Sequence, residues 1–214
     1  MYIVIEGVIG VGKTTLARLL QPAFQANLLL EVFEENPFLS SFYADRARYA
    51  FQTQIFFLLS RYHQQRRGIP DLTAAGQNLI GDYTFEKDAL FAAINLAGDE
   101  LEMYRRVHEA LAEKIQTPDL IVYLRAEVDL LMQRIAQRDR PYERNMERAY
   151  IAELADAYDH FYLHDSRPSP VLTIEVGELD FLARPADLQA AENRIKQALQ
   201  LSPFQPELPL SLTD

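Results

Sequence analysis

One short stretch near the start of the chain constrains its fold more than any other. Residues 7–14 have the sequence GVIGVGKT, which fits the pattern G-x-x-x-x-G-K-[ST]. The β-branched and aromatic run from Tyr2 to Ile5 predicts a buried strand before it, and the apolar spacing after it predicts a helix over residues 14–24. Strand, glycine-rich loop and helix therefore follow one another in the order that this pattern requires.

A loop of this kind holds phosphate groups mainly through its backbone. Its glycines permit positive φ angles and close approach to a ligand, so that successive N–H groups point into one cavity at the positive end of a helix dipole. The lysine adds a charge for the β- and γ-phosphates of a nucleotide, and the threonine hydroxyl can ligate Mg²⁺. A glycine-rich turn that binds nothing is the weaker alternative. The predicted ATP-binding residues of the loop are Gly7, Val8, Ile9, Gly10, Val11, Gly12, Lys13 and Thr14.

Composition limits the other partners of this chain. The 31 acidic and 21 basic residues give a formal net charge of −10, which argues against broad binding of nucleic acid or anionic membranes. The absence of cysteine excludes disulfides, thiolate catalysis and cysteine-ligated zinc. No apolar run is long enough to span a bilayer, and the N-terminus lacks the basic region of a signal peptide. We therefore expect a cytoplasmic protein that binds neither nucleic acid nor membranes.

Predicted strands and helices alternate along the rest of the chain. Further strands are expected at residues 27–33, 78–82, 120–124 and 170–176. Helices are expected at residues 40–67, 85–96, 99–115, 128–138, 148–164 and 186–199, with a loop at 68–76. This alternation predicts an α/β fold with a five-stranded, mainly parallel sheet flanked by helices. We expect one domain over residues 1–200 and a proline-containing tail over residues 201–214.

Two acidic residues stand near predicted strand ends. Glu31 lies close to the end of the second strand, and Asp82 ends the third. Because the carboxyl ends of parallel strands line the binding site in open α/β sheets, Glu31 is a candidate general base. Asp82 holds the place where phosphate-loop enzymes commonly support Mg²⁺. The alternative for Glu31 is an ordinary surface carboxylate, which the pattern alone favours.

Other candidate residues lie on predicted helices. The helix 40–67 carries three polar-tipped side chains, of which the Gln54 amide suits the edge of a nucleobase. The helix 128–138 ends in an arginine cluster that could clamp transferring phosphates as a lid. In both cases the alternative is an ordinary solvated or ion-paired surface. The polar-tipped residues are Tyr43, Gln54 and Arg61, and the arginines are Arg134, Arg138 and Arg140.

Several segments in this order and spacing resemble the deoxynucleoside kinase family, especially its bacterial deoxyguanosine/deoxyadenosine kinases. The segments are Ile5–Thr14, Glu31–Leu39, Tyr49–Arg61, Asp82–Ala92 and Arg138–Glu143, and the resemblance covers nearly the whole chain. It implies a P-loop kinase fold and ATP-dependent phosphorylation of a deoxynucleoside 5′-hydroxyl, with purines favoured, for nucleotide salvage. It also implies a homodimer formed through the long helices.

The resemblance implies a role for each matching acceptor-side residue. Glu31 matches the general base that accepts the proton of the 5′-hydroxyl. Tyr43 and Glu143 match the pair that holds the sugar 3′-hydroxyl. Gln54 matches the amide that reads the base edge, and Arg61 matches a base-side arginine.

On the donor side, the resemblance implies a lid at about residues 138–146. Arg134, Arg138 and Arg140 match lid arginines that neutralise phosphate charge, and with Lys13 the last two are expected to be catalytic. Asp180 and Phe181, in the loop that follows Gly177, match the segment near the ATP adenine. The resemblance agrees with Thr14 and Asp82 as the Mg²⁺ residues.

The chain departs from the family pattern after the third strand. Most members have Asp-Arg or Glu-Arg there, whereas this chain has Asp82-Tyr83. The charge that this arginine brings to the 5′-oxygen must therefore come from elsewhere. The segment that follows is one residue shorter than usual, so the acidic partner of Arg61 aligns with either Lys87 or Asp88.

Two other functions fit part of this pattern. A thymidylate kinase-like enzyme shares the phosphate loop and the arginine lid, but it needs an Asp-Arg pair and a basic site for the phosphate of its acceptor. Glu31 would repel such an anion. A nucleotide-binding switch protein without acceptor chemistry is the second alternative. The arginine cluster and the acid after the second strand favour transfer over binding alone.

Overall fold

A computed structural model describes residues 1–201, apart from the side chain of Glu34. The predicted tail therefore lies outside the described residues from position 202 onward. Within the described part of the chain, no helix is long and apolar enough to cross a membrane.

Five parallel strands form a single sheet in the order β2-β3-β1-β4-β5. They are β1 (Tyr2–Gly7), β2 (Ala26–Leu29), β3 (Asn78–Gly81), β4 (Leu120–Arg125) and β5 (Val171–Glu175). Every residue of the central strand β1 is buried. Helices cover both faces of a parallel sheet, so its strands are mostly apolar, and β1 carries a single buried charged residue, Glu6. The predicted α/β class and the five-stranded parallel sheet are confirmed.

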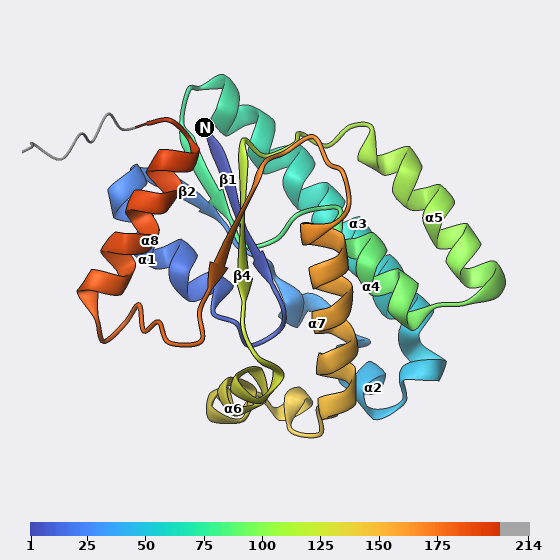
Figure 1. Cartoon of the computed structure of the whole chain (residues 1–214). Coiled ribbons are helices and arrows are strands. Elements are labelled where there is room, and N and C mark those ends of the chain that lie inside the picture. The colour runs from blue at the N-terminus through green and yellow to red at the C-terminus, as the bar shows by residue number, and fades with distance from the viewer. Residues whose placement is uncertain (202–214) are drawn as a thin grey trace, which may run out of the picture.

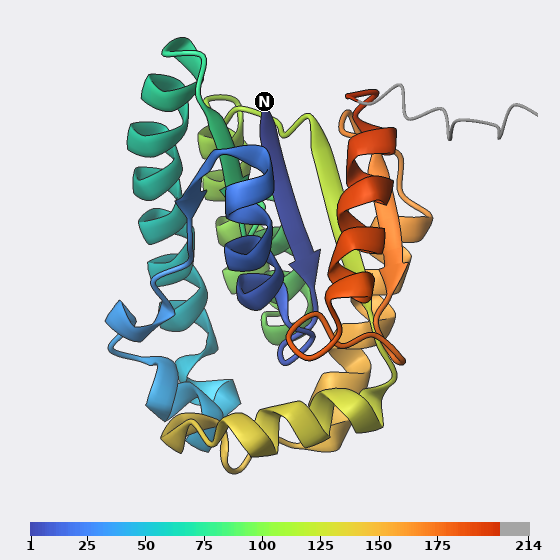
Figure 2. The ribbon, with the colours of Figure 1, turned by 90° about the vertical axis from the view of Figure 1, so that its left-hand side faces the viewer.

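Helices form a layer on each side of the sheet (Figure 1). One face is covered by α1 (Lys13–Phe24) and α8 (Pro185–Ala198). The other is covered by α3 (Arg46–Ala74), α4 (Lys87–Asn95) and α7 (Arg148–Leu163), with α5 (Gly98–Ala112) packed outside against α3 and α4. Two further helices, α2 (Leu39–Ala44) and α6 (Val128–Arg138), lie beyond the carboxyl ends of the strands. Figure 2 shows α6 running across the end of the sheet toward which β1 points.

The second predicted strand and the helix after it differ from the structure. Strand β2 ends at Leu29, and Phe33–Glu35 forms a short 3₁₀ helix, so Glu31 lies in the loop between them. The predicted helix 40–67 is divided at Asp45, which has an extended φ of −150°. The Asp45 side chain accepts a hydrogen bond from the backbone N–H of Arg48 and thereby caps α3.

The predicted loop at residues 68–76 is wrong, because α3 continues to Ala74 through Gly68 and Pro70. Gly68 faces the side chain of Leu29, and Ile69 is only 1% exposed. A proline removes a helical hydrogen bond, but the packing of this turn against the sheet favours continuation of the helix. Tertiary contacts therefore override two residues that locally favour a break.

Candidate active site

The loop between β1 and α1 has the conformation expected for phosphate binding. Gly7, Gly10 and Gly12 have φ angles of 144°, 88° and 105°, as predicted. A Cβ atom at Gly10 would lie 2.9 Å from the carbonyl oxygen of Leu131, so the loop packs directly against α6. The Nζ atom of Lys13 donates hydrogen bonds of 2.6 Å and 3.2 Å to the carbonyls of Gly7 and Val8. The lysine charge is thus held at the mouth of the loop.

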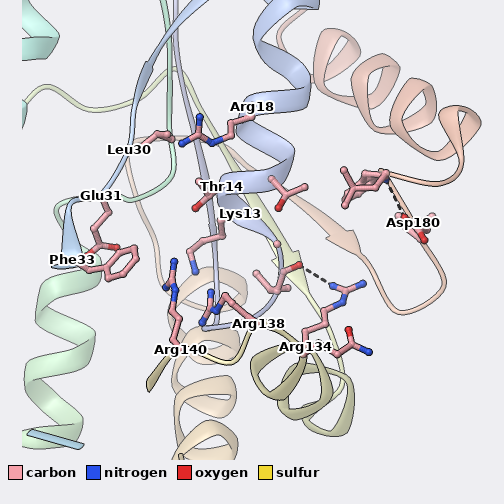
Figure 3. Close-up of a pocket in the computed structure, with 18 residues that line it drawn as sticks. Lys13, Thr14, Arg18, Leu30, Glu31, Phe33, Arg134, Arg138, Arg140 and Asp180 are labelled. Atoms are coloured by element: carbon pink, nitrogen blue, oxygen red, sulfur yellow. Dashed lines mark hydrogen bonds between the residues drawn. The ribbon is translucent and has the colours of Figure 1, made fainter. Parts of the chain in front are cut away.

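A cavity of about 760 Å³, here called the outer cavity, opens beside this loop. It is bounded by the loop, α6 and the segment after β5. Figure 3 shows the side chain of Lys13 pointing toward those of Arg138 and Arg140 across this space. The volume lies in the range of ligand sites. Predicted site residues that line it are Gly10, Val11, Gly12, Lys13, Thr14, Glu31, Arg134, Arg138, Arg140, Asp180 and Phe181.

A second cavity of about 130 Å³, the inner cavity, lies deeper in the molecule. Its walls combine aromatic side chains, among them Phe57, Phe91 and Tyr158, with charged and polar ones. Gln54 lines it, is 2% exposed, and has no hydrogen-bond partner for its Oε1 atom among the described residues. A buried amide oxygen without a partner is costly unless a ligand pairs with it. The inner cavity therefore suits a planar ring with a polar edge.

The two cavities meet at a shared wall. A group bound over the phosphate loop and a ring bound among the aromatic residues would approach each other there, beside the carboxylate of Glu31. This juxtaposition is the geometry that group transfer requires. The shared residues are Gly10, Lys13, Thr14, Glu31, Phe33, Arg138 and Arg140.

Thr14 and Asp82 fit a Mg²⁺ site. The hydroxyl of Thr14 donates a 2.5 Å hydrogen bond to Oδ2 of Asp82, while Oδ1 accepts the backbone N–H of Glu31 at 2.8 Å. Residues 1–201 contain no group of three or more His, Cys, Asp or Glu side chains arranged for a metal. Mg²⁺ commonly uses one or two protein oxygens together with nucleotide oxygens and water. The paired oxygens beside the loop match that donor set.

Glu31 is held by two cations, one on each carboxylate oxygen. Its Oε1 atom accepts hydrogen bonds from Arg61, including one of 2.9 Å from Nε, and its Oε2 atom accepts one of 2.8 Å from Nζ of Lys87. Burial disfavours the charged form, but the charges of Arg61 and Lys87 outweigh it and hold the pKa of Glu31 well below its usual range. Glu31 is therefore not an ordinary surface carboxylate; its side chain is 15% exposed.

Arg61 bridges Glu31 to Asp88, which is fully buried. Asp88 is thus the acidic partner of Arg61, and Lys87 forms an ion pair with Glu31. We call Glu31, Arg61, Lys87 and Asp88 the Glu31 cluster; it joins two cations to two carboxylates. Tyr83, at the position of the missing arginine, is buried in the core and donates a 2.6 Å hydrogen bond to Gln64.

The arginines around α6 line the outer cavity while making protein contacts. Arg138 donates hydrogen bonds to the carboxylate of Glu143 from Nη2, at 2.8 Å and 2.6 Å, and from Nε, at 3.1 Å. The guanidinium of Arg140 lies 3.6 Å from the same carboxylate. Arg134 donates a 2.9 Å hydrogen bond to the carbonyl of Val11 in the loop. The ion pairs with Glu143 are those expected if the arginines formed an ordinary ion-paired surface. The same guanidinium groups also line the outer cavity, where a ligand could reach them.

Tyr43 and Glu143, the two residues expected to hold the sugar 3′-hydroxyl, both line the inner cavity. The ring of Tyr43 stacks on Tyr142, with centroids 6.2 Å apart and planes at 9°. Burial raises the pKa of Tyr43 well above its usual value, so the phenol stays neutral and can donate a hydrogen bond.

Asp180 and Phe181 line the outer cavity, but their side chains differ in surroundings. The exposed carboxylate of Asp180 accepts hydrogen bonds from the backbone N–H groups of Leu182 and Ala183, at 3.0 Å and 2.9 Å. The Asp180 side chain therefore stabilises the turn in which it lies. The partly buried ring of Phe181 offers an apolar surface to the cavity.

Comparison with known proteins agrees with this geometry. A family model described as deoxynucleoside kinase matches residues 3–200. The chain belongs to the deoxynucleoside kinase family. It is 32% identical to the deoxyguanosine kinase of Bacillus subtilis (strain 168), over 92% of this chain and 97% of that protein. It is 33% identical to the deoxyadenosine kinase of Dictyostelium discoideum, over 83% of this chain and 73% of that protein.

The fold is also that of a solved deoxynucleoside kinase. The structure of deoxyadenosine kinase from M. mycoides with bound dATP has a TM-score of 0.79 and 24% identity, covering 92% of this chain and 99% of that one. The expected P-loop kinase fold is therefore confirmed.

Some residues that line the two cavities were not predicted as site residues. Lys87 at the start of a helix resembles any surface lysine, yet it is 3% exposed and ion-paired. Arg18 and Phe33 also line the outer cavity. An arginine on a helix and a phenylalanine after a strand are too common to single out. A charged residue flanked by others, as in Glu86-Lys87-Asp88, normally indicates a solvated face.

Proposed function

We propose that this chain transfers the γ-phosphoryl group of Mg-ATP to the 5′-hydroxyl of a deoxynucleoside, with purine deoxynucleosides favoured, in nucleotide salvage. The observation that carries the proposal is the shared wall between the two cavities, where Lys13 and Arg138 meet Glu31. The names of the deoxyguanosine and deoxyadenosine kinases among its relatives support the purine preference.

In this proposal the outer cavity holds ATP and the inner cavity holds the deoxynucleoside. Lys13 and the arginines of α6 neutralise charge on the phosphates, and Glu31 accepts the proton of the attacking hydroxyl. Mg²⁺, held through Thr14 and Asp82, supplies further charge neutralisation when it is bound. Phe181 and the loop of Asp180 would flank the adenine.

The remaining acceptor-side residues would position the deoxynucleoside. Gln54 pairs with the base edge, Arg61 fixes the base-side wall, and Tyr43 with Glu143 holds the 3′-hydroxyl. We further propose that the protein is a cytoplasmic homodimer whose two chains contact each other through their long helices, as the family resemblance implies.

The test is phosphoryl transfer from Mg-ATP to deoxyguanosine, deoxyadenosine, deoxycytidine, thymidine and thymidylate, measured in parallel. We expect the purine deoxynucleosides to give 5′-monophosphates fastest. Product from thymidylate alone would overturn the acceptor assignment. ADP formed at an equal rate without any acceptor would indicate a nucleotide-hydrolysing switch instead.

Tyr43→Phe should weaken deoxynucleoside binding by about 1 kcal/mol, roughly fivefold in Kd, because it removes one hydrogen bond to the 3′-hydroxyl. Titration calorimetry with the deoxynucleoside measures this loss. The same titration with a 2′,3′-dideoxynucleoside is the matched control, since that ligand lacks the partner hydroxyl and should bind both proteins equally. An equal loss with both ligands would show that Tyr43 does not hold the 3′-hydroxyl.

ATP binding should weaken at alkaline pH through Lys13. Burial, with the nearby charge of Lys87, lowers the pKa of Lys13 to about 8 in the ligand-free protein. Below that pH the ammonium is charged and binds phosphate; above it the charge is lost before ATP arrives. We expect the Kd for Mg-ATP to rise about tenfold between pH 7 and 9. Lys13→Arg keeps its charge, so any binding that it retains should not vary with pH over this range. A constant Kd in the unmodified protein would contradict this prediction.

A further inference from the structure

Lys87 is a buried cation to which the proposed mechanism gives no part. It stands at the start of α4, is 3% exposed, and lines the inner cavity. Within residues 1–201, its ammonium makes one hydrogen bond, of 2.8 Å, to Oε2 of Glu31. An ammonium group has three donors, so two remain for a ligand in the cavity that this side chain lines.

The other cation of the Glu31 cluster is fixed more firmly. Arg61 contacts Glu31 on one side and Asp88 on another, and its guanidinium lies 4.6 Å from the centroid of the Phe57 ring. Lys87 has Glu31 as its ion-pair partner and the ring of Tyr83 at 5.7 Å. A lysine on a flexible stem, tethered at one point, can redirect its charge, whereas a guanidinium held at three points cannot.

Lys87 and Lys13 bring two like charges to the same small cavity. Both side chains line the inner cavity, from α4 and from the phosphate loop respectively. Their proximity is consistent with the effect of the Lys87 charge on Lys13, whose pKa it lowers in addition to burial. Two ammonium groups that face one cavity repel each other until an anion enters between them. A phosphoryl group that passes from the outer to the inner cavity is such an anion.

We propose that Lys87 is a catalytic residue that donates a hydrogen bond to the acceptor oxygen during phosphoryl transfer. The hydroxyl proton moves to Oε2 of Glu31 as the bond between the acceptor oxygen and the γ-phosphorus forms. The bond from that phosphorus to the β–γ bridging oxygen breaks, and its electron pair leaves with ADP. Lys87 keeps its protons throughout. When its N–H turns from Glu31 to the acceptor oxygen, the carboxylate becomes more basic at the moment it receives the proton.

This inference rests on the proposed function, and a set of variants tests it separately. Lys87→Met should lower kcat about 10²-fold, the cost of one preorganised donor, while the Kd for Mg-ATP and the KM for the deoxynucleoside change less than about threefold. Lys87→Arg, which keeps a charged donor, should recover at least about a tenth of the wild-type kcat. Lys114→Met, at an exposed lysine, is the matched control and should leave kcat unchanged.

The decisive comparison uses the Glu31→Gln background. If Lys87 contacts the acceptor oxygen itself, Lys87→Met should lower the residual rate of Glu31→Gln by a further factor of about ten or more. No further loss would mean that Lys87 acts through Glu31 alone, which overturns the proposal.

A kcat within threefold of wild type for Lys87→Met would also overturn it. The proposal would also be overturned if Lys87→Arg were inactive and unfolded at a lower urea concentration than the wild type. That result would show that Lys87 is a structural counter-ion of Glu31. Absence of any deoxynucleoside phosphorylation by the wild-type protein would instead reject the proposed function.

Discussion

Replacing Glu31 by glutamine should lower kcat for deoxynucleoside phosphorylation by about 10²- to 10⁴-fold, the usual contribution of a general base. The amide has nearly the size of the carboxylate but cannot take a proton. Mg-ATP should still bind, because the phosphate loop and the α6 arginines remain. The measurements are the steady-state rate with a saturating purine deoxynucleoside and the Kd for Mg-ATP.

The position of Glu31 in its cluster makes controls necessary. Glutamine removes one negative charge from a buried group of two cations and two carboxylates, so the fold itself must be checked by urea unfolding. Glu31→Asp keeps the charge and shortens the side chain by one methylene; it should retain more activity than Glu31→Gln. Turnover of Glu31→Gln close to that of the wild type would remove Glu31 as the base.

The depressed pKa of Glu31 bears on its proposed role as the general base. A carboxylate held by two cations is a weak base in the ligand-free protein. In phosphoryl transfer the transition state is loose, and positioning with charge stabilisation supplies most of the acceleration. The cluster therefore fits a mechanism in which Glu31 orients the hydroxyl first and accepts its proton late, after Lys87 has turned toward the acceptor oxygen.

The second large effect that we expect is on stability. Asp88→Asn should lower the free energy of unfolding by about 3–5 kcal/mol, because it removes one partner of a buried ion pair. Asp88 is fully buried and contacts Arg61. Without its charge, the Glu31 cluster would carry two cations against one carboxylate in a site where solvent compensates poorly. Urea unfolding at neutral pH measures the difference.

The segment that follows α6 offers a matched control for this change. Asp139 also pairs with an arginine, since Nε of Arg144 donates a 2.7 Å hydrogen bond to its Oδ1 atom, but both side chains are largely exposed. Its φ of 49° suits asparagine as well as aspartate. Asp139→Asn should therefore leave the unfolding midpoint unchanged within error. Equal stability losses in the two variants would contradict the buried-charge argument.

The sequence by itself determined the local parts of this protein. The run of apolar residues, the glycine loop and the helix after it specify β1, the phosphate loop and α1, because each depends on neighbours within a few residues. The helix Val128–Arg138 was predicted with its observed bounds from apolar spacing alone. The alternation of strands and helices then determined the parallel sheet.

The tertiary structure alone decided the charge pairing. Glu31 follows β2, while Arg61 and Lys87 come from α3 and α4, 30 and 56 residues farther along the chain. Which of Lys87 and Asp88 faces Arg61 depends on the rotation of α4 against α3, a contact between helices that no local spacing encodes. The continuation of α3 through Gly68 and Pro70 has the same cause, since packing against the sheet outweighs local preference. Charge pairing acts through space, and the sequence specifies it only after the fold has brought these elements together.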